Sequence, residues 1–328
     1  MNEPIEGWFV ITYDDLIFEV KGVIHPRNRI IAYVRYVPDI DGERGGHRKV
    51  YNLHEREVFL KEKFPDYLWY SNNHGRILQS VPRNMVKSYL NPIKFLDYVK
   101  SEGNENAPLS IATVDLIDRL VKITGIKKSQ IGVTGSQLAN VAIESSDIDL
   151  VVYGEKTCRR FYDILRELYN RVPYLEQYSG KLLDTHVNFR WGELENYYPI
   201  LREIENRKFL QGIFDKYQFF IRLVKRPKDI KKSYGEVLTK LKGFCSIECI
   251  VTDISDSIFT PCEYLIKSLD YPEIRKLISY RGRFTEQLSE GVTAKARGRL
   301  EEVTDTKTGE TYQQVILGES SKDFLIPV

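Results

Sequence analysis

The segment from Ile131 to Tyr153 decides the fold. It consists of the run Ile131-Gly132-Val133, the turn Thr134-Gly135-Ser136, ten further residues, and the run Asp147-Ile148-Asp149-Leu150-Val151-Val152-Tyr153. The two apolar runs predict β-strands, and the residues from Gln137 to Val141 predict a short helix between them. Because side chains alternate along a strand, Asp147 and Asp149 project from the same face, while the apolar residue between them enters the core.

This arrangement predicts a site for a metal ion and a phosphate. Asp147 and Asp149 repel each other, so placing them side by side is costly unless a cation lies between them. Carboxylates are hard oxygen ligands of the kind that Mg²⁺ prefers. The turn at Gly135 and Ser136 leads into a helix and offers backbone N–H groups that suit a phosphate. One bound triphosphate with its cation would satisfy both features.

The same residues carry a family resemblance. Gly135-Ser136, Asp147 and Asp149 resemble the signature of the DNA polymerase beta nucleotidyltransferase superfamily: a Gly-Ser turn, a spacer, then Asp, an apolar residue and Asp or Glu. The predicted order of helix, strand, Gly-Ser turn, helix and Asp-x-Asp strand is also similar to the order of elements in that superfamily. Thr134 departs from the pattern, which favours an apolar residue there. The motif covers residues 131–154, and the core of the superfamily fold would cover about residues 108–252. The chain as a whole further resembles uncharacterised archaeal proteins predicted to be nucleotidyltransferases.

The resemblance implies a third carboxylate on a neighbouring strand. Glu248 is the first candidate, because it lies in the apolar run from Cys245 to Val251, where an acid is costly unless it is paired or bound to a metal. Asp184 is the rival, since the alternation from Lys181 to Arg190 predicts another strand with Asp184 and His186 on one face. Glu248 requires a helical insertion between strands and Asp184 does not. The sequence leaves the choice open.

The resemblance also implies a reaction. A nucleoside monophosphate would pass from an NTP to a hydroxyl acceptor, with release of pyrophosphate, by two-metal phosphoryl transfer that uses Mg²⁺ or Mn²⁺. Asp147 and Asp149 would bridge the two ions, Glu248 would hold the ion that activates the hydroxyl, and Gly135 and Ser136 would steady the departing phosphates. An RNA end, a protein side chain and a small molecule all fit as the acceptor. A non-catalytic nucleic-acid or nucleotide-binding protein that retains the fold is the alternative.

Basic residues indicate where anionic partners would bind. The net charge is only +2, so attraction to nucleic acid must come from local patches. Six cations lie within residues 222–232, and Arg222 is the first choice among them for a phosphate contact. A solvated helix end explains such a cluster equally well. Lys295, Arg297 and Arg299 alternate, so they predict a basic strip that would suit RNA or another nucleic acid, although many exposed strands have this pattern.

The chain divides into three predicted regions, which together give an α+β fold. Residues 1–103 form a β-rich N-terminal domain, with strands between Gly7 and Val37, helical stretches to Lys100, and a polar linker from Ser101 to Asn106. Residues 104–277 form the nucleotidyltransferase core, a mixed sheet flanked by helices. Residues 278–328 form a small β domain that resembles a barrel.

Further elements are predicted inside these regions. The apolar spacing predicts helices over 111–121 and 158–169, and a mainly helical segment from Glu193 to Val224. A strand is predicted from Phe244 to Thr252. The turn from Asp305 to Glu310 predicts a hairpin between the strands 292–303 and 312–317.

Composition excludes several classes of protein. There is no run of 18 apolar residues and the N-terminus is polar, so we expect neither a membrane span nor a signal peptide, and a cytoplasmic location. The four cysteines form no C-x-x-C pair, which argues against a zinc site. Hydrophobic residues make up 42% of the chain, which is enough for buried cores. The oligomeric state is not predicted.

Overall fold

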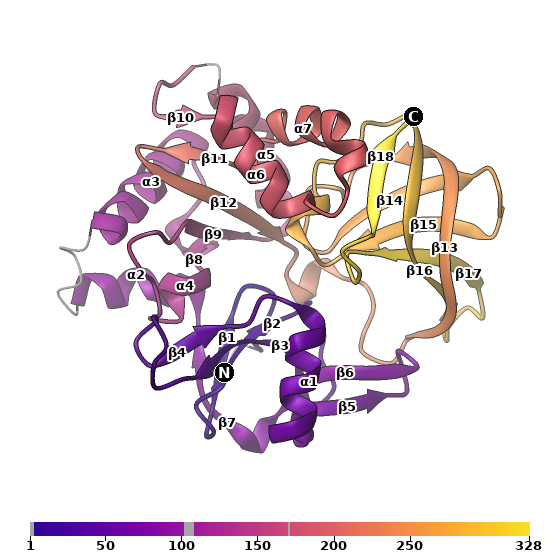
Figure 1. Cartoon of the computed structure of the whole chain (residues 1–328), viewed down its shortest axis with the longest axis horizontal. Helices are drawn as coiled ribbons and strands as arrows, with labels where there is room; N and C mark the ends of the chain where they lie inside the picture. The colour runs from indigo at the N-terminus through magenta and orange to yellow at the C-terminus, as the bar shows by residue number, and fades with distance from the viewer. Residues whose placement is uncertain (1–2, 102–107, 170) are drawn as a thin grey trace. The chain divides into compact units, whose positions relative to one another are not determined.

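The computed structural model describes residues 3–101, 108–169 and 171–328 of a mixed α and β protein, as predicted (Figure 1). The chain forms two compact units, which are described separately. Unit 1 comprises Met1–Tyr70, Ile77–Glu176 and Leu210–Lys231, and unit 2 comprises Ser71–Arg76, Gln177–Phe209 and Lys232–Val328. The predicted linker falls almost entirely on residues 102–107, outside the described residues. The predicted boundaries after residues 103 and 277 stay predictions.

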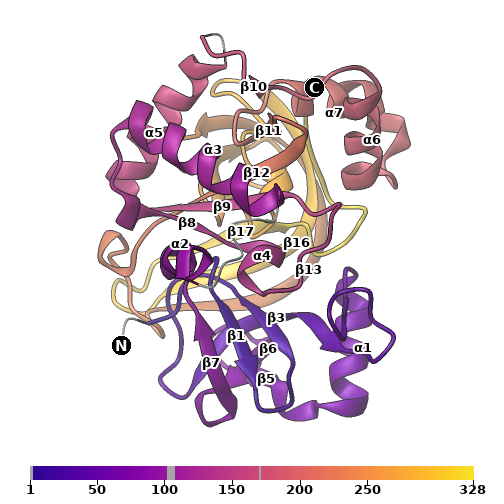
Figure 2. The ribbon, with the colours of Figure 1, turned by 90° about the vertical axis from the view of Figure 1, so that its left-hand side faces the viewer.

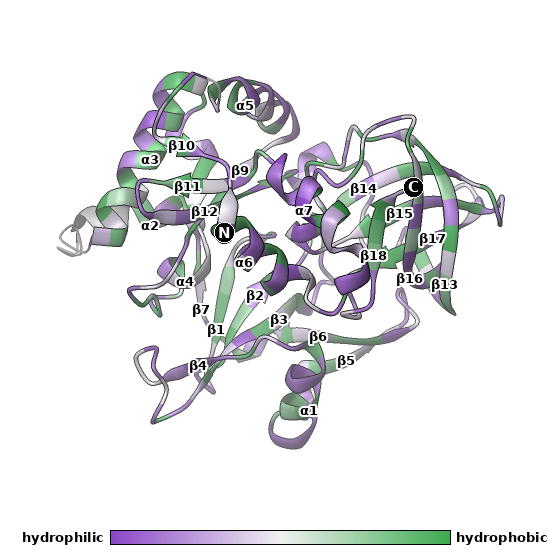
Figure 3. Ribbon diagram, turned by 45° about the horizontal axis from the view of Figure 1, so that its top comes forward, coloured by the Kyte–Doolittle hydropathy of each residue, from purple (hydrophilic) through white to green (hydrophobic). Residues whose placement is uncertain are grey.

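Unit 1 begins with a seven-stranded N-terminal sheet in the order β5-β6-β3-β2-β1-β7, with β4 paired to β3. Its elements are β1 (Phe9–Thr12), β2 (Ile17–Val20), β3 (Arg29–Pro38), β4 (His47–Lys49), α1 (Leu53–Lys63), β5 (Leu68–Ser71), β6 (Arg76–Pro82) and β7 (Val86–Leu90). The strands predicted between Gly7 and Val37 are confirmed, and Figure 3 shows β1 and β2 as mainly hydrophobic ribbons. The helical prediction up to Lys100 holds for α1 and for α2 (Pro92–Ser101), but it is wrong for β5, β6 and β7.

The second sheet of unit 1 has five strands in the order β10-β11-β12-β9-β8, and we call it the central sheet. Its strands are β8 (Ile131–Val133), β9 (Ile148–Tyr153), β10 (Leu175–Glu176), β11 (Gln211–Phe214) and β12 (Tyr217–Val224). The helices are α3 (Pro108–Thr124), α4 (Gly135–Leu138) and α5 (Glu155–Leu168). Figure 2 shows α3 and α5 side by side along this sheet. β12 runs parallel to β9, with Phe220 opposite Asp149.

Apolar contacts join the N-terminal sheet to the central sheet. Ile5 and Val23 pack with Val151, Tyr153 and Val224. A second cluster brings the N-terminal sheet onto α4; its buried members are Phe9, Ile17, Tyr36, Leu138, Ala139 and Val141. Val151 and Tyr153 share a strand face with Asp149, so this face of β9 is turned toward the N-terminal sheet.

Unit 2 contains two helices and a six-stranded sheet. The elements are α6 (Gly180–Trp191), α7 (Tyr198–Asn206), β13 (Val237–Asp253), β14 (Cys262–Ser268), β15 (Ile274–Ser279), β16 (Thr293–Asp305), β17 (Thr311–Leu317) and β18 (Phe324–Pro327). The strand order is β13-β14-β15-β17-β16-β18, and β13 also pairs with β16. Five strands therefore close into a ring, but β13, β14 and most of β15 precede residues 278–328, for which the barrel-like domain was predicted. The predicted hairpin is the antiparallel pair β16 and β17.

Two further predictions of secondary structure are wrong. The segment Lys181–Arg190 is not a strand but most of α6, because Leu183, His186, Val187 and Trp191 are buried at helical spacing. The segment predicted as mainly helical contains α7, but its last part forms β11 and β12. The eight residues of β12 include a nearly continuous apolar run, which periodicity alone does not separate from a buried helix.

No helix in the described part of the chain has both the length and the apolar character needed to cross a membrane.

Candidate active site

The two predicted acids lie at the start of β9. Asp147 directly precedes this strand and is exposed, whereas Asp149 is its second residue and is half-buried. The Thr134 N–H donates a hydrogen bond of 2.9 Å to the backbone oxygen of Asp149, which holds the Gly-Ser turn beside the strand. The turn and Asp149, which the sequence predicted to lie together, are therefore adjacent.

Gly135 fits against the Asp149 carboxylate as no other residue would. Its φ is +68°, in the left-handed region that favours glycine. A Cβ at Gly135 would overlap Oδ2 of Asp149 and would lie 2.7 Å from its Cγ. The missing side chain thus leaves the carboxylate in contact with the backbone of the turn.

The segment around the turn is anchored on both sides. The Thr134 hydroxyl is buried and donates a hydrogen bond of 2.6 Å to the Gly7 carbonyl, which explains a polar residue where the family pattern favours an apolar one. On the other side, Gln137 exchanges hydrogen bonds with Thr113 of α3, at 3.0 and 3.2 Å. Ser136 is buried, and its carbonyl accepts a bond of 3.0 Å from the Val141 N–H.

Arg222, predicted as a phosphate contact, lies on β12 in a network of buried charges. Its Nη1 donates to Glu6 Oε1 at 2.9 Å and to Glu19 Oε1 at 2.7 Å. Lys21 Nζ donates to the same two carboxylates at 3.0 and 2.8 Å. Burial opposes ionisation of Glu19, but Lys21, Arg222 and Arg35 outweigh it and hold the pKa of Glu19 well below its usual range. The network joins β12 to the N-terminal sheet, and a phosphate contact for Arg222 stays a prediction.

Asp149 faces charges that the sequence did not associate with it. Burial raises the pKa of Asp149, and the nearby Glu19 carboxylate adds to this rise. Arg222, Lys49 and Arg35 act in the opposite direction. Lys49 and Arg35 come from β4 and β3, about a hundred residues earlier in the chain, and no local motif marks them.

The third carboxylate does not lie where the resemblance implied. The described strands that pair with β9 are β8 and β12, whose sequences, IGV and YQFFIRLV, contain no Asp or Glu. The expectation that Glu248 or Asp184 lies on a strand neighbouring β9 is therefore wrong.

Both candidate acids belong to unit 2. Glu248 lies on β13 with a side chain 39% exposed, and its Oε1 is 3.4 Å from Lys295 Nζ. Asp184 lies on α6, where its Oδ1 accepts bonds from Arg202 Nε at 2.7 Å and from the Tyr198 hydroxyl at 2.9 Å. Each acid thus has a partner that accounts for its charge.

The aspartate pair suits a divalent cation that the substrate helps to hold. Among residues 3–101, 108–169 and 171–328, no three His, Cys, Asp or Glu side chains group as a metal site. Mg²⁺, however, is often bound by one or two carboxylates, with phosphates and water as its other ligands. Asp149 Oδ2 occupies the space that a Cβ of Gly135 would fill, so the carboxylate borders the turn proposed to bind phosphate. The donors present therefore fit a cation that arrives with a triphosphate.

The predicted basic strip of β16 is largely neutralised within unit 2. Lys295 approaches Glu248, and Arg299 is buried against Glu301 at 2.6 Å and also pairs with Glu319. Arg297 is exposed. Two of the three cations of the strip are therefore paired with acids of the same unit.

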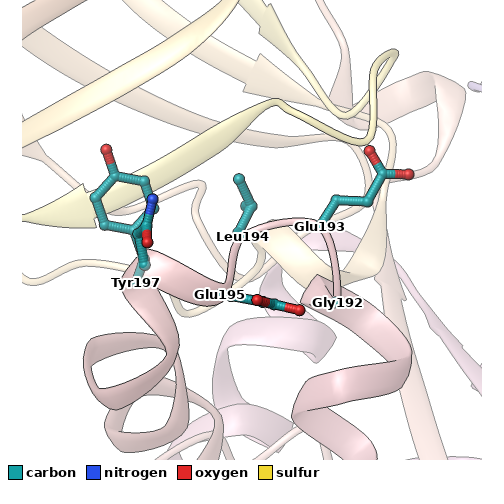
Figure 4. Close-up of a pocket in the computed structure, with 6 residues that line it drawn as sticks. Gly192, Glu193, Leu194, Glu195 and Tyr197 are labelled. Carbon is teal, nitrogen blue, oxygen red and sulfur yellow. The ribbon is translucent and has the colours of Figure 1, made fainter.

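A pocket in unit 2 lies on the loop between α6 and α7 (Figure 4). It is lined by Gly192, Glu193, Leu194, Glu195, Asn196 and Tyr197. Two of these residues are acidic, and Glu193 Oε2 accepts a hydrogen bond of 2.6 Å from the Ser321 hydroxyl. Its lining suits neither a triphosphate nor a nucleic-acid backbone.

Comparison with known proteins agrees with the motif. Residues 115–211 match the family described as nucleotidyltransferase domain, a range that contains Gly135, Ser136, Asp147 and Asp149. The chain is 27% identical to the uncharacterised protein MJ1086 of Methanocaldococcus jannaschii, over 96% of each chain. No solved structure matches it. Residues 115–211 are therefore similar to nucleotidyltransferase domains, the family that the Gly-Ser and Asp-x-Asp motif predicted.

Proposed function

We propose that this protein transfers a nucleoside monophosphate from an NTP to a hydroxyl acceptor and releases pyrophosphate. The contact between Gly135 and the Asp149 carboxylate carries the proposal, because it brings together the turn that would bind phosphate and an acid that would bind the metal. The family match over residues 115–211 supports nucleotidyl transfer as the reaction class.

Each motif residue would have one task. Asp147 and Asp149 would hold Mg²⁺ or Mn²⁺ with the oxygens of the triphosphate. A bound divalent cation supplies charge neutralisation on the phosphates and lowers the pKa of an attacking hydroxyl. The backbone of Gly135 and Ser136 would orient the β- and γ-phosphates so that the acceptor attacks the α-phosphorus in line. A phosphate contact from Arg222 is part of the hypothesis and rests on the sequence alone.

The acceptor is proposed only as a hydroxyl group. An RNA end, a protein side chain and a small molecule remain the candidate classes, and the partly buried surroundings of Asp149 would help to exclude water as a competing acceptor.

The test is incubation with each α-labelled NTP, Mg²⁺ or Mn²⁺, and either total RNA or a cell lysate. Wild-type protein should transfer label to one acceptor class, and Asp147→Asn and Asp149→Asn should each reduce transfer by at least about a hundredfold, since each removes an anionic metal ligand. Asp163→Asn, an exposed position on α5, is the matched control and should retain activity. Equal labelling by wild type and both motif variants would remove these acids from the chemistry.

A nucleotide-binding protein without transfer activity is the second candidate. The observation that favours it is the absence of an acid from β8 and β12, the strands beside β9. NTP binding by wild type without label transfer, across all three acceptor classes and both metals, would support this function over the enzyme.

A further inference from the structure

Two cations of the N-terminal sheet lie on the face that is turned toward the motif. Tyr36 of β3 is directly opposite Lys49 of β4, so the two side chains share a face. Tyr36 packs against Leu138 and Ala139, at the end of the short helix that Gly135 and Ser136 begin. This pairing directs Lys49 toward the Gly-Ser turn and Asp149.

A β-bulge places Arg35 on the same face. The β2–β3 register pairs Ile17 with Tyr36 and Phe18 with Val34, which leaves Arg35 as the extra residue on β3. At such a bulge two consecutive side chains lie on one side of the sheet. Tyr36 packs with Ile17, and Arg35 Nε is 3.8 Å from Glu19 Oε2, so both side chains project from the face that carries Ile17 and Glu19.

These two cations are less fully paired than their neighbours. Arg222 and Lys21 are each bound to two carboxylates at 3.0 Å or less. Arg35 has only the longer contact with Glu19 and is 28% exposed. Lys49 Nζ lies 4.6 Å from the centroid of the Tyr51 ring, and no described carboxylate is within ion-pair distance of it. Cations that are partly removed from water without a close anion are costly unless a ligand supplies the negative charge.

The electrostatics of Lys49 agree with this geometry. Burial lowers the pKa of Lys49 and repulsion from Arg35 lowers it further, whereas the Tyr51 side chain and the Asp149 carboxylate counteract these effects. Arg35, Lys49 and Asp149 therefore act on one another within one region of unit 1. An incoming polyanion would relieve the repulsion between the two cations.

We propose that Arg35 and Lys49 bind the triphosphate of the NTP, so that the N-terminal sheet forms the second wall of the nucleotide site opposite Gly135 and Ser136. The inference rests on the proposed function, because it names the residues that hold the substrate of that reaction. Arg35 suits the task because its planar guanidinium offers forked donors to phosphate oxygens, and Lys49 adds a compact point charge. Arg222 is then a positioning residue that keeps Glu19, and with it Arg35, in place.

The test measures binding rather than transfer. Inorganic tripolyphosphate and Mg·ATP are titrated by calorimetry into wild type, Lys49→Met and Arg35→Met. Methionine keeps the apolar stem and removes the charge. Each variant should bind both ligands about tenfold to a hundredfold more weakly, the range expected for one charge-assisted contact. Lys49→Arg should regain most of the lost affinity, which a purely structural role would not require.

Arg48→Met is the matched control. Arg48 is the neighbour of Lys49 on β4, lies on the opposite face, and pairs with Asp39 and Glu55. Its affinity for both ligands should stay within about twofold of wild type. Tripolyphosphate affinities within twofold of wild type for folded Lys49→Met and Arg35→Met would overturn the inference, as would a wild type that binds neither ligand.

The outcomes separate this inference from the proposed function. Charge-dependent binding with no label transfer by the wild type would support the triphosphate site and contradict the transferase. Transfer that depends on Asp149 but is unchanged in Lys49→Met and Arg35→Met would support the transferase and overturn the inference.

Discussion

Gly135 lies directly against the carboxylate of Asp149, so that a Cβ at this position would overlap Oδ2. The two residues are fourteen positions apart in the chain, on α4 and β9, and the Thr134 N–H fixes their distance through its bond to the Asp149 carbonyl. The geometry of the acid thus depends on the absence of a side chain on the turn.

Gly135→Ala should therefore damage activity more than stability. The added methyl group forces either the turn or the Asp149 side chain to move, and a small misplacement of a catalytic group can cost about a hundredfold in rate. We expect label transfer to fall by about that factor, while the free energy of unfolding falls by about 1–2 kcal/mol from the strained φ. Steady-state kinetics and urea denaturation measure the two effects.

Gly45→Ala distinguishes the effect of steric overlap with Asp149 from the effect of backbone strain at a positive φ. Gly45 has a φ of +60°, close to that of Gly135, but a Cβ there would meet nothing within 4 Å. This variant should show a similar loss of stability with unchanged transfer. Equal loss of transfer in both variants would mean that the contact with Asp149 is not what matters.

The contact between the turn and the acid could be predicted because it is local. Only the end of the short helix α4 and an irregular segment lie between Ser136 and Asp147, and strand alternation then directs Asp149 to the face beside the turn. Arg35 and Lys49 could not be found in this way. Their approach to Asp149 depends on how the N-terminal sheet packs on α4, through contacts between residues about a hundred positions apart.

The sequence also did not predict which strands pair with one another in a sheet. Glu248 lies in a strand, as predicted, but β13 pairs with β14 and β16, and nothing in the run Cys245–Val251 encodes its partners. The prediction that Asp184 lies on a strand was wrong for a different reason. Over the ten residues from Lys181 the polar and apolar positions fit both a strand and a helix, and only the buried Trp191 at the end completes the helical pattern.

Lys208→Met should destabilise unit 2 because it leaves a buried acid without its closest cation. Lys208 Nζ is 2.9 Å from Glu205 Oε1, and both side chains are at most 1% exposed. His186 and Trp191 also bond to Glu205 but do not replace the ammonium charge. We expect a loss of about 3–5 kcal/mol in the free energy of unfolding. Arg207→Met removes only a bond to the Gln287 carbonyl and should cost about 1 kcal/mol.

His25 should make the stability of unit 1 depend on pH. Its Nδ1 accepts from the Ile31 N–H at 3.2 Å and its Nε2 donates to the Pro4 carbonyl at 3.0 Å, which requires the neutral ring. Burial lowers the pKa of His25 to about 4, against about 6.5 in the unfolded chain. Between these values the unfolded state binds more protons, so stability falls as the pH drops from 6.5 toward 4.

Urea denaturation at intervals from pH 7.5 to 4.5 measures this dependence. His25→Asn should be less stable at pH 7.5 but should show a shallower loss toward pH 4.5, and His54→Asn, at an exposed position, should follow the wild type. The same slope in wild type and His25→Asn would show that His25 does not cause it.

Arg222→Met should uncouple the N-terminal sheet from β12. The substitution leaves Glu6 and Glu19 with Lys21 as their remaining close cation, and Glu6 is completely buried. We expect a loss of about 3 kcal/mol in the free energy of unfolding, the lower end of the range for breaking a buried ion pair, because Lys21 still neutralises part of the charge. Arg226→Met is the control, because the Arg226 guanidinium donates only to the Ser129 carbonyl, at an exposed site. This substitution should cost less than about 1 kcal/mol.

If Arg222 positions Glu19 and Arg35, tripolyphosphate affinity should fall in Arg222→Met even under conditions where the variant is fully folded. An unchanged affinity in a folded but destabilised variant would confine Arg222 to stability.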